Sequence, residues 1–336
     1  MKRLLVTLFC LCSCVAGAGF DDDVPYLRGK WRADVTDKST GIGLKELKAE
    51  ADRIVAAEKG KVPWCLVKAH LFETICDRMS VGFSPHDIFP AFACWSRRDR
   101  ILTKTINARM AEVDRLYCPD AGRKAAAVKG SCLRHDYDHA VPDWDRALAL
   151  GFTGLKAEVD ASPATNDFRK AMSIAADAML RNVARFADCA RKSACAGSPA
   201  VQAQVAALDR LAKGPPRTAY EAMMFQLLFF VYGEHVDHLQ VRSLGNWDRI
   251  MLPYYEADLA AGRTTREKFK EQVKRFWWQW GSIDNWWGQP VYIGGTKSDG
   301  TTEYNEVSMD PHCHQKRFTC SLNFSRVVRP AARSAS

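Results

Sequence analysis

The chain has 336 residues, of which 47% are hydrophobic and 26% are charged, as in a globular protein with one large domain or two smaller ones. The formal net charge is +9, but the basic side chains are spread along the chain among acidic ones. Because binding to nucleic acid needs a coherent basic face, we expect no nucleic-acid partner.

The first residues have the pattern of a secretory signal. Lys2 and Arg3 precede an apolar run at 4–15, and small residues occupy 16–19. A basic start, a short apolar core and a small-residue exit are the three parts of such a signal, and the run is too short to span a membrane comfortably. We therefore expect a signal-peptide-like segment at 1–18 and no membrane span. The alternative is a start codon assigned upstream of the true one.

The cysteines point toward a different compartment. The chain has 12 cysteines, and three of them, Cys10, Cys12 and Cys14, lie inside the signal-like segment. The others are irregularly spaced without any C-x-x-C, which argues against a zinc ribbon or a thioredoxin-like pair. An odd number left after signal removal fits a reducing compartment better than a secreted protein. The sequence therefore leaves the localisation unknown, between export and the cytoplasm.

Apolar residues at helical spacing predict helices along most of the chain. These helices are expected at 44–59, 62–80, 101–117, 164–194, 199–213 and 265–287. Another helix begins after Pro142 and Asp143 and is expected to end at Leu150, because Gly151 follows. The stretch 83–95, with its prolines and aromatic residues, is predicted to be a packed loop.

The segment 219–239 is apolar nearly all round, which is typical of a buried helix. Thr218 and Glu221 form a capping box at its start. Short strands are expected at 130–134 and at 290–293, the second of them buried. Long helices separated by a few short strands suit an α/β barrel with parallel strands, so the predicted fold class is α/β and helix-rich.

Two groups of histidines are candidates for metal sites. His235 and His238 are three residues apart and could share a helix face, and imidazole is a good ligand for zinc. They have no clear third ligand, however, so a solvated helix end is the better interpretation. The group His312, Cys313 and His314 lacks a second ligand pair. We therefore expect no metal site.

A tryptophan-rich run, formed by Trp277, Trp278, Trp280, Trp286 and Trp287, could offer a stacking platform for a ligand. Its spacing is helical, and aromatic side chains bury large apolar areas in cores, so a core or interface role is favoured. No G-x-S-x-G, P-loop or G-x-G-x-x-G motif is present. Hydrolysis at a nucleophile elbow and nucleotide binding are therefore not supported.

His139 is placed differently, just before the helix that Pro142 and Asp143 begin. Loops that follow barrel strands expose side chains at the barrel mouth, where an imidazole could exchange a proton with a substrate hydroxyl. A capping or structural histidine is the alternative.

Three segments together resemble the pyruvate formate-lyase family of glycyl-radical enzymes. They are the stretch 215–263, the later GGTKSDGTTEYNEVS at 294–308, and DHAVPDWDRALALGFTGL at 138–155. The resemblance covers about 62–308 with the segments in the family's order. It implies that 19–308 is the N-terminal part of such a domain, an incomplete (half) ten-stranded α/β barrel, followed by a divergent basic tail at 309–336.

The resemblance also implies substrate-binding residues. His139 falls where dehydratase-type members have a pocket histidine, and Ser243 falls in the S-x-G-R-x-D motif that lines the same cavity. This chain has Asn246 where the motif has arginine, which removes a bidentate donor. We expect His139 and Ser243 to share one face of the barrel.

The chemistry of the family starts at a glycyl radical, which a radical-SAM activating enzyme installs, and passes to a cysteine thiyl radical. In this chain no cysteine directly follows a glycine, and no glycine follows Gly300. We therefore expect no catalytic residues, no bound cofactor, and a truncated or degenerate enzyme that is inactive alone.

The resemblance implies that intact relatives cleave C–C or C–O bonds of small polar substrates, and it leaves open that they form homodimers. The alternative function is an exported, non-catalytic ligand-binding helical protein. This alternative uses the tryptophan-rich run as its platform.

Overall fold

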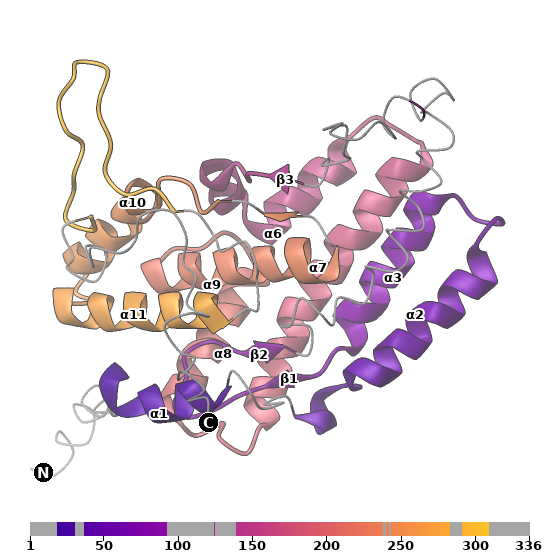
Figure 1. The fold of residues 1–336 in the computed structure, drawn as a ribbon, viewed down its shortest axis with the longest axis horizontal. Coiled ribbons are helices and arrows are strands. Elements are labelled where there is room, and N and C mark those ends of the chain that lie inside the picture. Colours follow the sequence, from indigo (N-terminus) through magenta and orange to yellow (C-terminus); the bar gives the residue numbers. More distant parts are fainter. Residues whose placement is uncertain are drawn as a thin grey trace, which may run out of the picture.

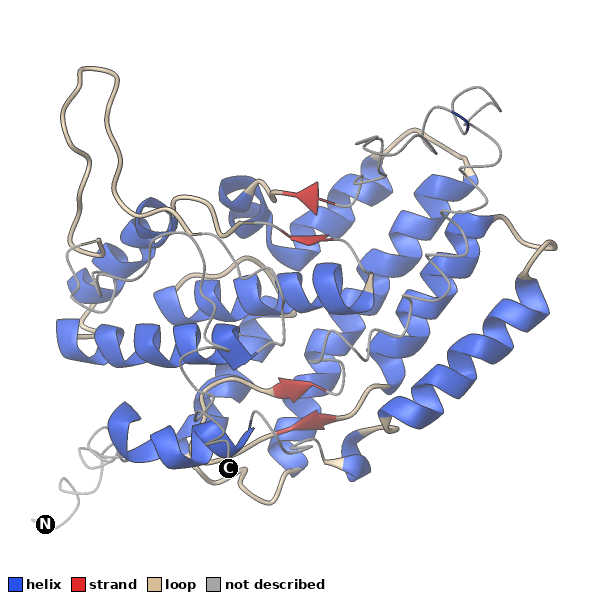
Figure 2. Cartoon of the chain, viewed as in Figure 1, coloured by secondary structure: helices blue, strands red, loops and turns tan. Residues whose placement is uncertain are grey.

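The computed structural model describes residues 19–30, 37–92, 124, 139–237, 240–241, 243–282 and 291–308. Over these residues the protein is a body of helices with two small strand pairs at separate places (Figure 2). The helices are α1 (Phe20–Lys30), η1 (Lys38–Thr40), α2 (Leu44–Glu58), α3 (Trp64–Arg78), α6 (Trp144–Ala161), α7 (Asp167–Lys192), α8 (Pro199–Leu211), α9 (Ala219–Phe230), η3 (Val231–Val236), α10 (Trp247–Ala260) and α11 (Arg266–Ser282). The strands are β1 (Val81–Gly82), β2 (Ala91–Phe92), β3 (His139–Ala140) and β4 (Gln240–Val241).

Several predicted helices are confirmed. The helices α2, α3, α7 and α8 begin and end within three residues of the expected positions. Side-chain caps, which were not predicted, begin two of them: the side-chain oxygens of Asn166 and Ser198 accept hydrogen bonds at the N-termini of α7 and α8. Such caps satisfy backbone N–H groups that have no partner inside the helix. The predicted helix at 101–117 and strand at 130–134 lie outside the described residues.

The prediction that Gly151 ends its helix is confirmed for the backbone geometry, because Gly151 is non-helical, with φ of 61° and ψ of −177°. A second helical stretch that was not predicted follows directly, so that α6 continues across this kink to Ala161. Glycine adopts this left-handed conformation without the penalty that a Cβ atom brings. The backbone of Pro215 packs directly against this position, so the kink lets α6 bend past the connection between α8 and α9.

Replacing Gly151 by alanine is expected to lower the free energy of unfolding by about 2 kcal/mol, from left-handed strain and overpacking. A Cβ atom at this position lies 2.7 Å from the Cα of Pro215. Gly60 is a matched control, because it has φ of 79° but nothing within 4 Å of a Cβ. Gly60→Ala is expected to cost about 1 kcal/mol or less. Urea denaturation followed by circular dichroism measures both, and equal losses contradict the packing argument.

The capping box before α9 is confirmed with a small difference. The Thr218 hydroxyl oxygen accepts from the N–H of Glu221 at 3.2 Å. The Glu221 carboxylate accepts from the N–H of Arg217 at 2.7 Å, one residue earlier than in the usual box. The α-helix that was predicted to reach Leu239 ends at Phe230, and the chain continues as the π-helix η3.

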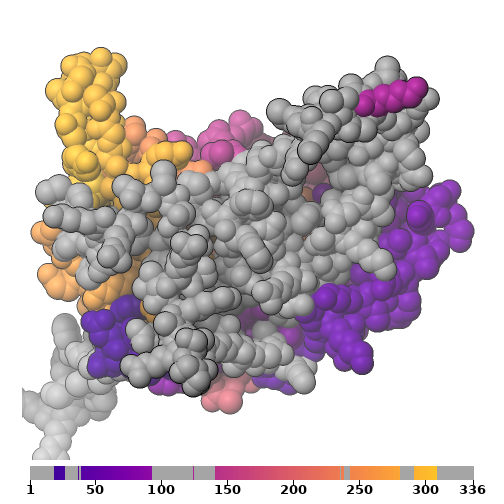
Figure 3. Space-filling model, viewed as in Figure 1, coloured from indigo at the N-terminus to yellow at the C-terminus, as the bar shows by residue number. Residues whose placement is uncertain are grey.

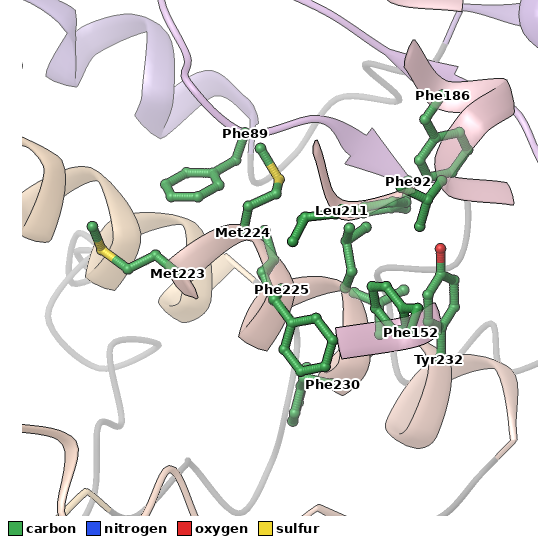
Figure 4. Close-up of a cluster of buried hydrophobic side chains, with 14 of the residues drawn as sticks. Phe89, Phe92, Phe152, Phe186, Leu211, Met223, Met224, Phe225, Phe230 and Tyr232 are labelled. Atoms are coloured by element: carbon green, nitrogen blue, oxygen red, sulfur yellow. The ribbon is translucent and has the colours of Figure 1, made fainter. Parts of the chain in front are cut away.

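Helix α9 lies at the centre of the molecule and is buried on all sides, as predicted (Figure 1). Phe225 is in contact with Phe152 of α6, with ring centroids 4.5 Å apart, and Phe230 is in contact with Trp280 of α11 at the same distance. Figure 4 shows how side chains from several helices and β2 meet in this core. Because α9 supplies apolar groups in every direction, it holds the surrounding helices together.

The predicted core role is confirmed for Trp277 and Trp280, whereas Trp278 is half-buried against Phe20 of α1. Trp277 and Trp280 are 6% and 3% exposed. The ring of Trp277 lies 4.9 Å from that of Trp247, at the start of α10. Trp286 and Trp287 lie outside the described residues. A stacking platform is therefore not formed by Trp277 and Trp280.

The strands form two separate pairs. β1 pairs with β2 in antiparallel fashion. β1 lies just before the stretch 83–95 that was predicted to be a loop, and β2 lies inside it. β3 and β4 are parallel, with His139 opposite Gln240 and Ala140 opposite Val241. The strand predicted at 290–293 is not buried at Tyr292, whose side chain is 59% exposed. Tyr292 makes an isolated parallel bridge to Asn246.

Within the described ranges, no helix combines the length and apolar character needed to cross a membrane.

Candidate functional site

The parallel pair β3–β4 brings together two segments that are about a hundred residues apart in the chain. Parallel strands end at the same edge of a sheet, and in α/β proteins ligands bind at that edge. The helix α6 follows β3 here, and Ser243 follows β4. The indole N–H of Trp144, the first residue of α6, donates to the carbonyl of Ser243 at 2.9 Å. This bond is buried and fixes the two segments against each other.

Of the two predicted substrate-binding residues, the structure describes the side chain of Ser243 and the backbone of His139. Ser243 is 4% exposed, and its hydroxyl oxygen accepts from the N–H of Gly245 at 2.9 Å. Gly245 has φ of 68°, so the chain turns sharply directly after Ser243. The backbone of His139 lies in β3, but its side chain is outside the described residues. The structure thus brings their backbone segments together, and a shared pocket stays a prediction.

Asn246, which replaces the arginine of the motif, is exposed and makes no side-chain cap for α10. Its neighbours hold the segment 291–308 through the backbone: the N–H of Trp247 donates to the carbonyl of Tyr292, and the N–H of Tyr292 donates to the carbonyl of Gly245. A guanidinium is present one turn later. Arg249 pairs with Glu303 at 2.9 Å, so the positive charge in α10 is directed at the segment 291–308.

Asp248 is the residue whose role sequence reasoning missed. It is 0% exposed, and one carboxylate oxygen (Oδ2) accepts from the Gly294 N–H and from the Ser308 hydroxyl, both at 2.7 Å. The other oxygen accepts from the N–H of Arg249 at 2.9 Å. Asp248 therefore joins the first turn of α10 to both ends of the segment 294–308. The signal that could have found it is the aspartate of the S-x-G-R-x-D motif.

The segment 291–308 is a hairpin that projects from the body (Figure 1), and it is equally prominent in the space-filling view (Figure 3). Its base is ordered by Asn305, whose side-chain oxygen accepts from the N–H groups of Val307 and Ser308. Its tip, around the turn at 297–300, is exposed. The hairpin base lies next to the turn that follows Ser243, so Asp248 fixes the position of the hairpin beside the candidate site.

The short π-helix η3 leads from α9 into the segment before β4. Short π-helical insertions occur frequently at functional sites. Glu234 within it is 1% exposed. Asp237, which follows η3, pairs with Lys68 of α3 at 2.8 Å. Burial raises the pKa of Asp237, and the positive charge of Lys68 opposes this rise.

A solvated helix end was predicted around His235 and His238. Glu234, next to His235, is instead buried, because the core encloses the π-helix η3. The side chain of His235 and all of His238 lie outside the described residues. In the part of the chain that the structure describes, no three His, Cys, Asp or Glu side chains are grouped to hold a metal ion. His312, Cys313 and His314 also lie outside it.

Comparison with known protein families gives a match to the pyruvate formate lyase-like family over residues 55–310. The isethionate sulfite-lyase of Bilophila wadsworthia is 27% identical over 188 residues, which are 50% of this chain and 22% of that enzyme. The glycyl radical subunit of 4-hydroxyphenylacetate decarboxylase from Clostridioides difficile is 28% identical over 113 residues, which are 30% of this chain and 12% of that subunit.

Solved structures show the same fold. The B12-independent glycerol dehydratase from Clostridium butyricum matches with a TM-score of 0.63 at 15% identity, over 85% of this chain and 44% of the dehydratase. A protein of 1,2-propanediol dehydration in Roseburia inulinivorans matches with a TM-score of 0.63 at 18% identity. The match covers 85% of this chain and 44% of that protein. The chain thus spans less than half of the length of the relatives that it matches.

Proposed function

This chain belongs to the pyruvate formate lyase-like family, and from that premise we propose that it binds a small hydroxylated compound beside the strands β3 and β4. The described residues are taken to form part of the ten-stranded α/β barrel of the family. The parallel strand pair and the TM-score of 0.63 over 85% of the chain support this assignment.

The observation that carries the proposal is the parallel pairing of β3 with β4, which sets His139 one strand away from the segment that ends at Ser243. In this proposal the imidazole and the hydroxyl each form a hydrogen bond with the ligand, and apolar neighbours exclude water. Two such bonds hold a hydroxyl group in one orientation. The structural relatives are a glycerol dehydratase in its glycerol-bound form and a protein of 1,2-propanediol dehydration, and both glycerol and 1,2-propanediol are compounds of this class.

Binding is proposed without turnover by these 336 residues. The relatives are glycyl-radical enzymes, whose radical is installed by an activating enzyme, but this chain has no glycine–cysteine pair to receive it. Residues 1–336 are therefore proposed to bind the ligand without catalysing a radical reaction by themselves.

The test is calorimetric titration of the purified protein with glycerol and with propane-1,2-diol, in air and without an activating enzyme. We expect saturable binding, and we expect the diol to be recovered unchanged. Ser243→Ala is expected to weaken binding about tenfold, since it removes a hydrogen bond in a buried site. Ser173, which is on the surface of α7 and bonds Asp160, is the control: Ser173→Ala keeps the affinity. Equal affinities for both variants, or formation of an aldehyde, contradict the proposal.

A further inference from the structure

The indole of Trp144 connects the two strand segments of the candidate site. Trp144 follows β3 as the first residue of α6, and it is 3% exposed. Its N–H donates at 2.9 Å to the carbonyl of Ser243, which lies 99 residues later in the chain. An indole nitrogen is a donor only, and here it is bonded to the backbone of Ser243. The bond therefore sets the position of that backbone without using the Ser243 hydroxyl.

Trp144 is itself held in place by its neighbours. Its ring meets the ring of Phe229, in the last turn of α9, edge to face with centroids 5.5 Å apart. Asp143, directly before it, caps α6 by accepting from the N–H of Arg146 at 3.1 Å. A large side chain in a close-packed core stays in one rotamer on the time average. The indole donor therefore has a fixed position with respect to both α6 and α9.

The turn that receives this bond is held at both of its ends. The hydroxyl oxygen of Ser243 accepts from the N–H of Gly245 at 2.9 Å, and Gly245 has φ of 68°. A Cβ atom at Gly245 lies 3.4 Å from Cδ1 of Trp144, so the indole also packs against the turn. The carbonyl of Gly245 accepts from the N–H of Tyr292 at 2.9 Å. Trp144 thus holds the start of the turn, and the hairpin holds its end.

We propose that Trp144 is a positioning residue for ligand binding, whose N–H holds the Ser243 carbonyl so that the Ser243 hydroxyl meets the ligand from a fixed position. This inference rests on the proposed function, which assigns Ser243 to the ligand. Because Trp144 follows β3 and Ser243 follows β4, the bond continues the contact between the two strands past their paired residues. A polar group that is already ordered loses less conformational freedom on binding. The tether therefore raises affinity without touching the ligand.

The first test compares two variants of the full chain by calorimetric titration with glycerol. Trp144→Phe removes the donor and keeps an aromatic ring beside Phe229, and we expect the affinity to fall about fivefold, the scale of one hydrogen bond. Tyr220→Phe is the matched control, because the Tyr220 hydroxyl also donates to a backbone carbonyl, that of Ile88, but at the opposite end of α9. We expect this variant to keep the affinity. Equal losses in the two variants overturn the proposal.

A double-mutant cycle with Ser243→Ala separates positioning from a general loss of stability. Ser243→Ala removes the hydroxyl and keeps the carbonyl that accepts from Trp144. If Trp144 acts through Ser243, Trp144→Phe has no further effect on the affinity once the hydroxyl is absent, so the two single losses are not additive. Additive losses mean that Trp144 contacts the ligand or supports the site by another route, and they contradict the assigned role.

Hydrogen exchange without ligand distinguishes failure of this inference from failure of the proposed function. In Trp144→Phe we expect the amide of Gly245 to exchange about fivefold faster, because release of the Ser243 carbonyl loosens the turn by about one hydrogen bond. In Tyr220→Phe we expect its rate to stay unchanged. Absence of binding by the unaltered chain overturns the proposed function, and the positioning role with it. Binding by the unaltered chain, together with an unchanged Gly245 rate in Trp144→Phe, overturns the positioning role alone.

Discussion

Replacing Asp248 by asparagine is expected to lower the free energy of unfolding by about 3 kcal/mol, the scale for a buried group whose partners lose their acceptor. The carboxylate accepts from three donors at once: the N–H groups of Gly294 and Arg249 and the hydroxyl of Ser308. An amide offers one oxygen and one NH₂ group. In either orientation of the new side chain, its NH₂ group faces at least one N–H donor, and that donor stays unsatisfied.

Urea denaturation measures the loss, and hydrogen exchange locates it. We expect the amide of Gly294 to exchange faster in the variant, because its bond to Asp248 fixes the base of the hairpin. Asp299 is the matched control, since its carboxylate also accepts from a backbone N–H and a hydroxyl, both of Thr301, but at the exposed tip. Water replaces those partners, so Asp299→Asn is expected to cost less than about 0.5 kcal/mol. Similar losses for the two variants are incompatible with the bracing role of Asp248.

The helices that could be predicted are those in which the spacing of apolar residues along the chain indicates the buried face. In α7, buried residues such as Val183, Phe186 and Ala190 return every three or four positions, which is the period of one face of a helix. In α9 the apolar residues occur on all sides, which identifies a central helix without any knowledge of its neighbours. The Thr218 cap is local as well, so the start of α9 was predicted accurately.

Helix α10 was missed for a physical reason. Its buried residues include Asp248 and Asp258 beside Trp247 and Tyr255, and acidic residues normally indicate an exposed face. These two acids are buried because distant groups satisfy them: Asp258 accepts from the N–H of Ala219 at 2.8 Å and pairs with Arg263. Local sequence cannot tell which donors the fold will bring to a carboxylate. The same holds for Asp23 in α1, which pairs with Arg275 of α11 at 2.6 Å.

The candidate site shows a similar division. The family motifs identified Ser243 and His139 as residues of interest, and the strands that carry or precede them proved to be neighbours. Their neighbourhood depends on the pairing of β3 with β4, across a long stretch of chain. The motif aspartate, Asp248, holds the base of the hairpin through its carboxylate. A motif can therefore identify a residue correctly while the fold gives that residue a supporting contact that the motif does not reveal.

The second large effect is expected at Arg185 of α7. Its guanidinium donates to the carbonyls of Thr40, Cys76 and Met79 at 2.8, 3.1 and 2.6 Å. Cys76 and Met79 belong to the C-terminal turn of α3 and its cap, where carbonyls lack partners inside the helix and a positive charge is favourable. Burial lowers the pKa of Arg185, which reflects the desolvation that the guanidinium bears in this position.

Arg185→Met is therefore expected to lower the free energy of unfolding by about 3 kcal/mol, since the new side chain fills the space but removes a charged donor from three carbonyls. Asn182 still donates to the carbonyl of Cys76, and the Cys189 thiol makes a long contact with that of Thr40. Arg181 is the matched control, one turn earlier in α7. It pairs with Glu73 and Asp77 on the surface, and exposed ion pairs contribute about 0.5 kcal/mol. Urea denaturation of both variants tests the difference. If Arg181→Met costs as much as Arg185→Met, the α3–α7 contact is held by surface charge and not by the capping of α3.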